Sequence, residues 1–160
     1  MIKIVTGFDV HRLVAGRQLV LGGVNIDYAL GLEGHSDADV LCHAVADALL
    51  GAVADGDIGT HFPDSESKWK DISSLNILSR VMERLKARHA LVIHIDSTIL
   101  AEEPLLSPYR DKMRLNIAQA LYVKKECISV KMTTLEGLGA LGHKEGIAAM
   151  AVATVEEIGK

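Results

Sequence analysis

Cysteine, proline and aromatic residues are all scarce in this chain of 160 residues. It contains two cysteines and three prolines, and Phe, Trp and Tyr together make up 4%. Two cysteines without a paired spacing fit a reducing compartment and not a disulfide framework. We predict that Cys42 and Cys127 are both buried thiols, and that Cys42 is a core residue and not a metal ligand.

Basic residues and long apolar runs are also few. The 17 Lys and Arg residues against 21 Asp and Glu give a net charge of −4, and no basic stripe of the kind that follows nucleic-acid phosphates is present. No apolar run approaches the ~20 residues that span a bilayer. We therefore expect neither nucleic acid nor a membrane as partner. A bacterial cytoplasmic location is the simplest expectation, with a mature plastid protein as the alternative.

The hydrophobic share of the chain, 49%, is sufficient for one domain with a real core, covering residues 1–160. Within it, residues 35–52 combine two histidines and three aspartates with an apolar run typical of a helix. Ser36 is the predicted N-cap. Asp39, His43 and Asp47 are spaced by four residues and share one helix face. This stripe alone is ambiguous, because a histidine on a helix is more often a core or surface residue than a ligand.

A second group of candidate ligands lies near the N-terminus. Residues 2–11 are rich in β-branched side chains and predict a strand, on which Asp9 and His11 project to the same face. One carboxylate and one imidazole from a strand, with His43 from a helix, form a three-ligand set suited to zinc that leaves the fourth position for water or substrate. Asp47 either orients the His43 imidazole or is a solvated carboxylate.

The rest of the chain alternates between helical and strand patterns. Their order predicts an α+β sandwich with helices on one face of a mixed sheet. We predict a hairpin at 18–26, a surface loop at 56–70, helices from Ser73 or Ser74 to 88 and at 109–121, strands at 91–100, 128–134 and 147–155, and a glycine-rich turn at 137–142.

Several motifs together resemble the 2-C-methyl-D-erythritol 2,4-cyclodiphosphate synthase family. They are Gly-Phe-Asp-Val-His at 7–11, the block 36–52, Gly-Asp-Ile-Gly at 56–59 with Phe-Pro-Asp at 62–64, Thr-Thr at 133–134 with Glu136, and Gly-Ile-Ala at 146–148. The resemblance runs in register over nearly the whole chain. It implies a ferredoxin-like fold and a homotrimer whose sheets face the threefold axis, with an active site at each subunit junction.

The family's reaction, by this resemblance, is an intramolecular phosphoryl transfer. The 2-phosphate of 4-diphosphocytidyl-2-C-methyl-D-erythritol 2-phosphate attacks the β-phosphorus of the same molecule, which releases CMP and closes the 2,4-cyclodiphosphate. Such an enzyme is a phosphorus-oxygen lyase in the non-mevalonate supply of isoprenoid precursors. Because the nucleophile is already an anion, the site must fold a flexible polyanion and neutralise its charge.

The resemblance also implies residue roles. Asp9, His11 and His43 would hold Zn²⁺, Glu136 would hold a second divalent cation, Mg²⁺ or Mn²⁺, and His35 and Thr134 would be catalytic by stabilising the transition state. Residues matching the family's substrate contacts are Asp9, Val10, His11, His35, Ser36, Asp57, Ile58, Gly59, Phe62, Pro63, Asp64, Ser65, Glu66, Ala101, Glu102, Glu103, Pro104, Leu105, Leu106, Ser107, Thr133, Thr134, Leu135, Glu136, Ala140 and His143. The stretch 101–107, with 133–136, would bind the cytidine diphosphate of the substrate from a neighbouring subunit.

The chain departs from the family pattern in this cytidine region. Leu105 stands where a basic residue is usual, and the segment 135–143 lacks several charges and one aromatic, with Ala140 and His143 among the replacements. We predict that His143 or Lys144 replaces the lost positive charge. Two other functions stay open: a zinc-dependent phosphodiesterase or hydrolase that uses the same three ligands, and a non-catalytic trimer that binds isoprenoid diphosphates.

Overall fold

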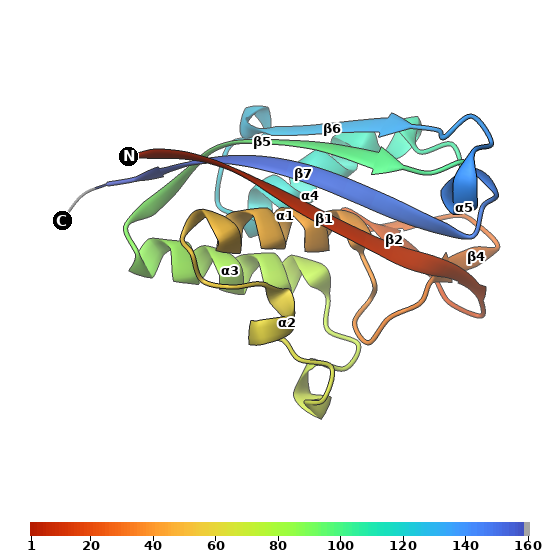
Figure 1. Cartoon of the computed structure of the whole chain (residues 1–160), viewed down its shortest axis with the longest axis horizontal. Helices are drawn as coiled ribbons and strands as arrows, with labels where there is room; N and C mark the ends of the chain where they lie inside the picture. The colour runs from red at the N-terminus through yellow and green to blue at the C-terminus, as the bar shows by residue number, and fades with distance from the viewer. Residues whose placement is uncertain (159–160) are drawn as a thin grey trace.

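A mixed five-stranded sheet forms the centre of the protein, whose computed structural model describes residues 1–158 (Figure 1). Strands β5 and β6 are parallel, and the other neighbours are antiparallel. Strand β1 is the longest and pairs with β7 along almost its whole length. In spatial order the strands are β4 (Leu30–Leu32), β1 (Ile2–Ala15), β7 (Gly146–Glu157), β5 (Ala90–Leu100) and β6 (Ile128–Thr133).

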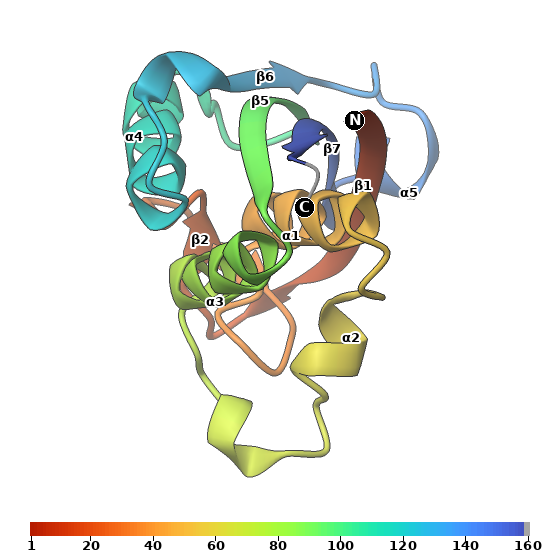
Figure 2. The same cartoon turned by 90° about the vertical axis from the view of Figure 1, so that its left-hand side faces the viewer.

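The three long helices all lie on one face of this sheet, as the two views show (Figures 1 and 2). They are α1 (Val40–Ala52), α3 (Ser74–Ala87) and α4 (Arg110–Ala120). Helix α1 packs on β1 and β7, and α3 packs on α1. The predicted α+β architecture, with helices on one face of a mixed sheet, is therefore confirmed.

Short elements connect these layers. The predicted hairpin is present as β2 (Leu19–Leu21) and β3 (Val24–Ile26). The segment predicted as a loop contains α2 (Ile58–His61) and the 3₁₀ turn η1 (Ser67–Trp69). The predicted glycine-rich turn contains α5 (Gly139–Gly142), and two further 3₁₀ turns are η2 (Ser107–Tyr109) and η3 (Lys125–Cys127).

Helix α1 is buried on nearly all sides because it lies between the sheet and α3. Its small residues permit a close approach to β1. A Cβ atom on Gly7 would come within 2.0 Å of the Ala44 carbonyl oxygen, so only glycine fits at this crossing. The strand that carries Asp9 and the helix that carries His43 are thereby held close together.

Within residues 1–158, no helix covers the opposite face of the sheet (Figure 2). It presents an apolar surface from three adjacent strands, which we call the open sheet face. Its exposed members are Ile2, Ile4, Phe8 and Val10 of β1, Leu91 and Ile93 of β5, and Met150 of β7.

Two local predictions were wrong, and one predicted strand is longer than expected. Helix α1 begins at Val40 with Asp39 as its N-cap, not at Ser36, because the Asp39 carboxylate accepts a hydrogen bond from Cys42 N. The first strand continues past His11 to Ala15, where it pairs with the unpredicted β4. Cys127 is half-buried in η3, although Cys42 is fully buried as predicted.

Among residues 1–158, no helix has the length and apolar character needed to cross a membrane.

Candidate functional site

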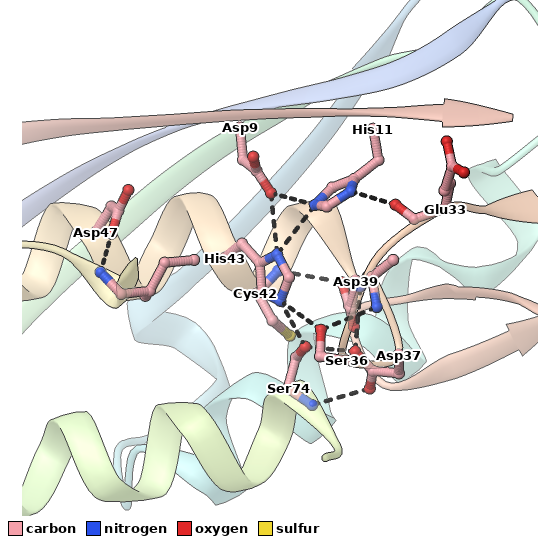
Figure 3. Close-up of polar contacts among 12 residues, drawn as sticks. Asp9, His11, Glu33, Ser36, Asp37, Asp39, Cys42, His43, Asp47 and Ser74 are labelled. Carbon is pink, nitrogen blue, oxygen red and sulfur yellow. Dashed lines mark hydrogen bonds and ion pairs between the residues drawn. The ribbon is translucent and has the colours of Figure 1, made fainter. Parts of the chain in front are cut away.

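Asp9, His11 and His43 come together beneath strand β1, where Asp9 and His11 project from the strand toward His43 of α1 (Figure 3). Asp9 Oδ2 lies 2.9 Å from His11 Nε2 and 3.0 Å from His43 Nδ1. The two imidazole nitrogens are 3.3 Å apart. Within the described residues, these three side chains form the group able to hold a metal ion. The sequence-based prediction that they meet is confirmed.

The donor set fits zinc. Two ligands about 2.0–2.1 Å from a tetrahedral ion lie roughly 3.3 Å from each other, which is close to the spacing of these atoms. On the far side of its ring, His11 Nδ1 donates to the Glu33 carbonyl oxygen at 2.6 Å. This contact fixes the tautomer and leaves Nε2 free as a ligand. Three ligands of this kind leave one coordination position open for water or substrate.

The Asp9 carboxylate and the two imidazoles influence each other's protonation. Burial raises the pKa of Asp9, but hydrogen bonds from His11 and His43 outweigh burial and hold its pKa well below the usual range. Burial lowers the pKa of His11, but its hydrogen bond and charge interaction with Asp9 outweigh that effect and raise it. Asp9 is therefore an anion across the physiological range and is paired with imidazole nitrogens.

The side chains of the other two aspartates of the helix stripe make no hydrogen bond to the His43 ring; Asp39 accepts from His43 N only through its backbone carbonyl. Asp39 is fully buried and accepts hydrogen bonds from Gly22 N and Gly23 N at 2.9 and 2.7 Å, which joins the β2–β3 hairpin to α1. Asp47 accepts from Ile58 N at 2.8 Å and so holds the start of α2. The suggestion that Asp47 orients the His43 ring was wrong, because hydroxyl groups occupy that position.

A cavity of about 370 Å³ opens beside the three ligands; we call it the metal cavity. Of the predicted substrate contacts, Val10, Asp57 and Glu66 do not line it: Val10 is on the open sheet face, and Asp57 accepts from Thr60 N as the N-cap of α2. Predicted residues that do line it are Asp9, His11, His35, Ser36, His43, Ile58, Gly59, Phe62, Pro63, Asp64 and Ser65. The sequence did not single out Gly34, Trp69, Ile72 and Ile77, which complete the wall.

A second hollow, of about 250 Å³, lies next to the ends of β5 and β6; we call it the distal hollow. Arg110 and Met132 line it without having been predicted, and Arg110 supplies a basic group near Leu105. The predicted lining residues are Ala101, Glu102, Pro104, Leu105, Leu106, Ser107, Thr133 and Thr134. Glu103, Leu135, Glu136, Ala140 and His143 lie outside its wall.

The two predicted catalytic residues do not meet within one chain. His35 lines the metal cavity and Thr134 lines the distal hollow, and the two hollows share no residue. Both views place α2, beside the metal cavity, and β6, beside the distal hollow, on opposite sides of the molecule (Figures 1 and 2). Thr134 Oγ1 instead donates to Glu136 Oε1 at 2.8 Å. One chain thus carries two separate hollows, each with one of the two predicted catalytic residues.

The basic residues near α5 take different positions. Lys144 Nζ contacts Glu103 Oε1 at 2.7 Å, and Glu103 also accepts a hydrogen bond from Tyr28. The charge of Lys144 is therefore offset by a carboxylate. His143 is exposed at the C-terminal end of α5.

Comparison with known proteins agrees with this geometry. The family model described as the YgbB family matches residues 2–156. The 2-C-methyl-D-erythritol 2,4-cyclodiphosphate synthase of Salinibacter ruber is 54% identical over 150 residues, which cover 94% of this chain and 96% of the relative. That of Methylobacillus flagellatus is 50% identical and covers 98% of both chains.

Solved structures share the fold. The structure described as IspF from Plasmodium falciparum in complex with CDP has a TM-score of 0.87 at 30% identity, covering 99% of this chain and 97% of that chain. Residues 2–156, which the family model matches, include the three candidate ligands and both predicted catalytic residues. The chain belongs to the YgbB family.

Proposed function

We infer that this chain is a 2-C-methyl-D-erythritol 2,4-cyclodiphosphate synthase that acts in isoprenoid precursor synthesis. It converts 4-diphosphocytidyl-2-C-methyl-D-erythritol 2-phosphate into the cyclic diphosphate and CMP. The observation that carries this function is the 54% identity to a synthase of that name over nearly the full length of both chains. The convergence of Asp9, His11 and His43 supports it independently.

We propose that Asp9, His11 and His43 hold Zn²⁺, and that Glu136 holds a second ion, Mg²⁺ or Mn²⁺. Bound divalent cations supply Lewis-acid polarisation of phosphoryl oxygens and neutralise the charge that crowds there. Within residues 1–158, no Lys or Arg lines the metal cavity, so bound cations would supply the positive charge that this wall lacks. Glu136 is oriented by the hydroxyl of Thr134, which leaves its other carboxylate oxygen available.

The side chains of the metal cavity bind and shape the substrate in this proposal. His35 lies beside the ligands and donates hydrogen bonds to phosphate oxygens as charge develops in the transition state. Ile58, Phe62 and Ile77 supply apolar wall for the methylerythritol carbon skeleton and exclude water. Ser36, Asp64 and Ser65, which also line the cavity, supply polar groups for the sugar hydroxyls.

We propose that the distal hollow of a neighbouring subunit completes each site. The relative from Plasmodium falciparum binds CDP, and residues 101–107 with Thr133 and Thr134 form a hollow of suitable size for a base and ribose. In this chain Arg110 and Leu105 both line the hollow, so a basic group is retained in its wall. Residues 1–160 then form one catalytic domain that works as part of an assembly.

The assembly we propose is a homotrimer of ferredoxin-like subunits with the sheets facing a threefold axis. The open sheet face supports it, because Ile4 is 71% exposed and Phe8 55%, and a continuous apolar surface of this kind is typical of an interface. A trimer also explains why His35 and Thr134 lie in separate hollows: each active site would form where the metal cavity of one subunit meets the distal hollow of the next.

Product analysis tests the reaction. The purified chain is incubated with the cytidine substrate, zinc and magnesium, and products are identified by mass spectrometry. CMP together with the cyclic diphosphate is expected, whereas a linear phosphate product would identify the phosphodiesterase alternative. His35→Ala and Thr134→Ala should each lower kcat by about 10²-fold or more, because each removes a transition-state hydrogen bond. A chain that fulfils its cellular role with both substitutions is a binding protein and not an enzyme.

A further inference from the structure

The His43 ring contacts two serine hydroxyls on the side that faces away from Asp9 and His11 (Figure 3). His43 Nδ1 faces Asp9 and His11, whereas Nε2 lies 2.9 Å from Ser74 Oγ and 3.2 Å from Ser36 Oγ. An imidazole that offers one nitrogen to a metal carries its proton on the other. The Nε2 proton is therefore donated toward these hydroxyls, and the shorter contact is to Ser74.

The Ser74 hydroxyl is itself held by a carboxylate. Ser74 Oγ donates to Asp37 Oδ1, and the Ser74 backbone N–H donates to Asp37 Oδ2 at 2.8 Å. An ionised carboxylate only accepts, so the hydroxyl proton points to Asp37 and the hydroxyl lone pairs point to His43. The direction of each hydrogen bond in the chain Asp37–Ser74–His43 is thus determined.

Burial makes this chain of hydrogen bonds strong. Ser74 is fully buried at the first position of α3, and His43 is 5% exposed, so water does not compete for either contact. Ser36 differs, because its oxygen also accepts from Ala38 N at 3.1 Å. The neighbouring Ser73 makes no side-chain hydrogen bond as N-cap of α3. Ser74 therefore contacts His43 whereas its neighbour Ser73 does not, so substitution of Ser73 provides a matched control.

We propose that Ser74 is a positioning residue for the metal site. Its oxygen, oriented by Asp37, holds the His43 ring with Nδ1 toward Asp9 and His11. This inference rests on the metal role in the proposed function. Removal of a hydrogen-bond partner from a metal-ligating histidine typically weakens metal binding 10–100-fold.

The test compares Ser74→Ala with Ser73→Ala in the full chain. The Zn²⁺ dissociation constant is measured by competition with a chromogenic chelator, and melting temperature is measured with and without Zn²⁺. Ser74→Ala should raise the dissociation constant about 10–100-fold and reduce the zinc-induced rise in melting temperature, whereas Ser73→Ala should leave both unchanged. Activity lost by Ser74→Ala should return when zinc exceeds the raised dissociation constant, which a general folding defect would not permit.

Three results would contradict the proposal. If Ser74→Ala binds Zn²⁺ as tightly as the unaltered chain, Ser74 does not position His43, although the metal role stands. If the unaltered chain does not bind Zn²⁺, the metal assignment and this inference both fall. If Ser74→Ala does not fold, Asp37→Asn is tested in its place, because this variant keeps the Ser74 hydroxyl but weakens its orientation. A raised Zn²⁺ dissociation constant for Asp37→Asn supports the proposal, and an unchanged one overturns it.

Discussion

Gly7 of β1 lies against the main chain of Ala44 in α1, so close that a Cβ on Gly7 would also come within 2.7 Å of Ala48 N. Backbone atoms of a buried helix cannot move aside as a side-chain tip can. The contact sets the spacing between the strand that carries Asp9 and the helix that carries His43.

Gly7→Ala should destabilise the protein by about 2–3 kcal/mol or more, because overpacking against fixed backbone forces the strand and the helix apart. Urea unfolding measures the change. Gly51→Ala is the control: its Cβ would meet only Val5 Cγ1 at 3.0 Å, a side-chain tip, and it lies near the end of α1. Equal effects of the two substitutions would show that the β1–α1 spacing is not constrained by Gly7.

Activity should return when two inactive variants share one assembly. In a random mixture of co-expressed His43→Ala and Thr134→Ala subunits, half of the subunit junctions have an intact metal cavity. Half of these junctions also have an intact distal hollow on the neighbouring subunit, so about one quarter of all junctions are complete. About one quarter of the unaltered activity is therefore expected in the purified mixture.

The control for this experiment pairs His43→Ala with Asp9→Ala. Both substitutions damage the metal cavity, so no junction is intact and no activity should return. A lack of recovery in the His43→Ala and Thr134→Ala mixture would mean that the site is completed within one chain.

Asp55 should contribute stability that depends on both pH and salt. Hydrogen bonding to Arg84 is the largest cause that holds its pKa below the usual value, and the charges of Arg84, Arg88 and His61 add to it. Because the folded pKa is the lower one, this contribution is present above the unfolded pKa, ~3.9, and is lost as pH falls through the folded value. Both arginine side chains are more than 40% exposed, so screening limits the effect.

Asp55→Asn should therefore cost about 0.5–1 kcal/mol at pH 7 and low salt, and less in 1 M salt or at pH 3. Denaturant unfolding at the two pH values measures it. Asp111→Asn serves as comparison, because Asp111 is 77% exposed beside Arg114 and should contribute nothing measurable. A loss from Asp55→Asn that is the same at pH 3 and pH 7 would exclude an ionic origin.

Asp39→Ala should cost about 3 kcal/mol, because it removes a helix cap and leaves the N–H groups of Gly22, Gly23 and Cys42 without their acceptor in a buried position. Asp39→Asn retains one acceptor oxygen and should cost less than Asp39→Ala. Thermal and urea unfolding compare the two. An equal cost for both variants would show that the hydrogen bonds to this oxygen contribute little.

Much of the metal site follows from local periodicity. Asp9 and His11 share a face because strand side chains repeat every two residues, and His43 was identified from its place on an apolar helix. Ser74 could not be found in this way. It reaches His43 from the start of another helix, 31 residues later in the chain, so only the packing of α3 on α1 brings the two together.

Tertiary contacts also explain the errors in local structure. Ser36 is a residue type that often caps helices. The Asp39 carboxylate, however, accepts hydrogen bonds from Gly22 N of the β2–β3 hairpin and from Cys42 N, so the helix begins at Val40. Residue patterns within one chain did not reveal that His35 and Thr134 lie in separate hollows. The expectation of an active site at a subunit junction came instead from the family resemblance.

The hydrogen bonds between residues 35–37 and 71–74 link the wall of the metal cavity to the groups that hold the His43 ring. Asp71 N donates to His35 O, and Asp37 N donates to Ile72 O. With the Asp37–Ser74 contacts, these bonds fasten the C-terminal end of the segment that carries α2 and η1, while the hydrogen bond from Ile58 N to Asp47 fastens its start to α1. A substitution that loosens this segment would therefore disturb the orientation of the imidazole as well as the shape of the cavity.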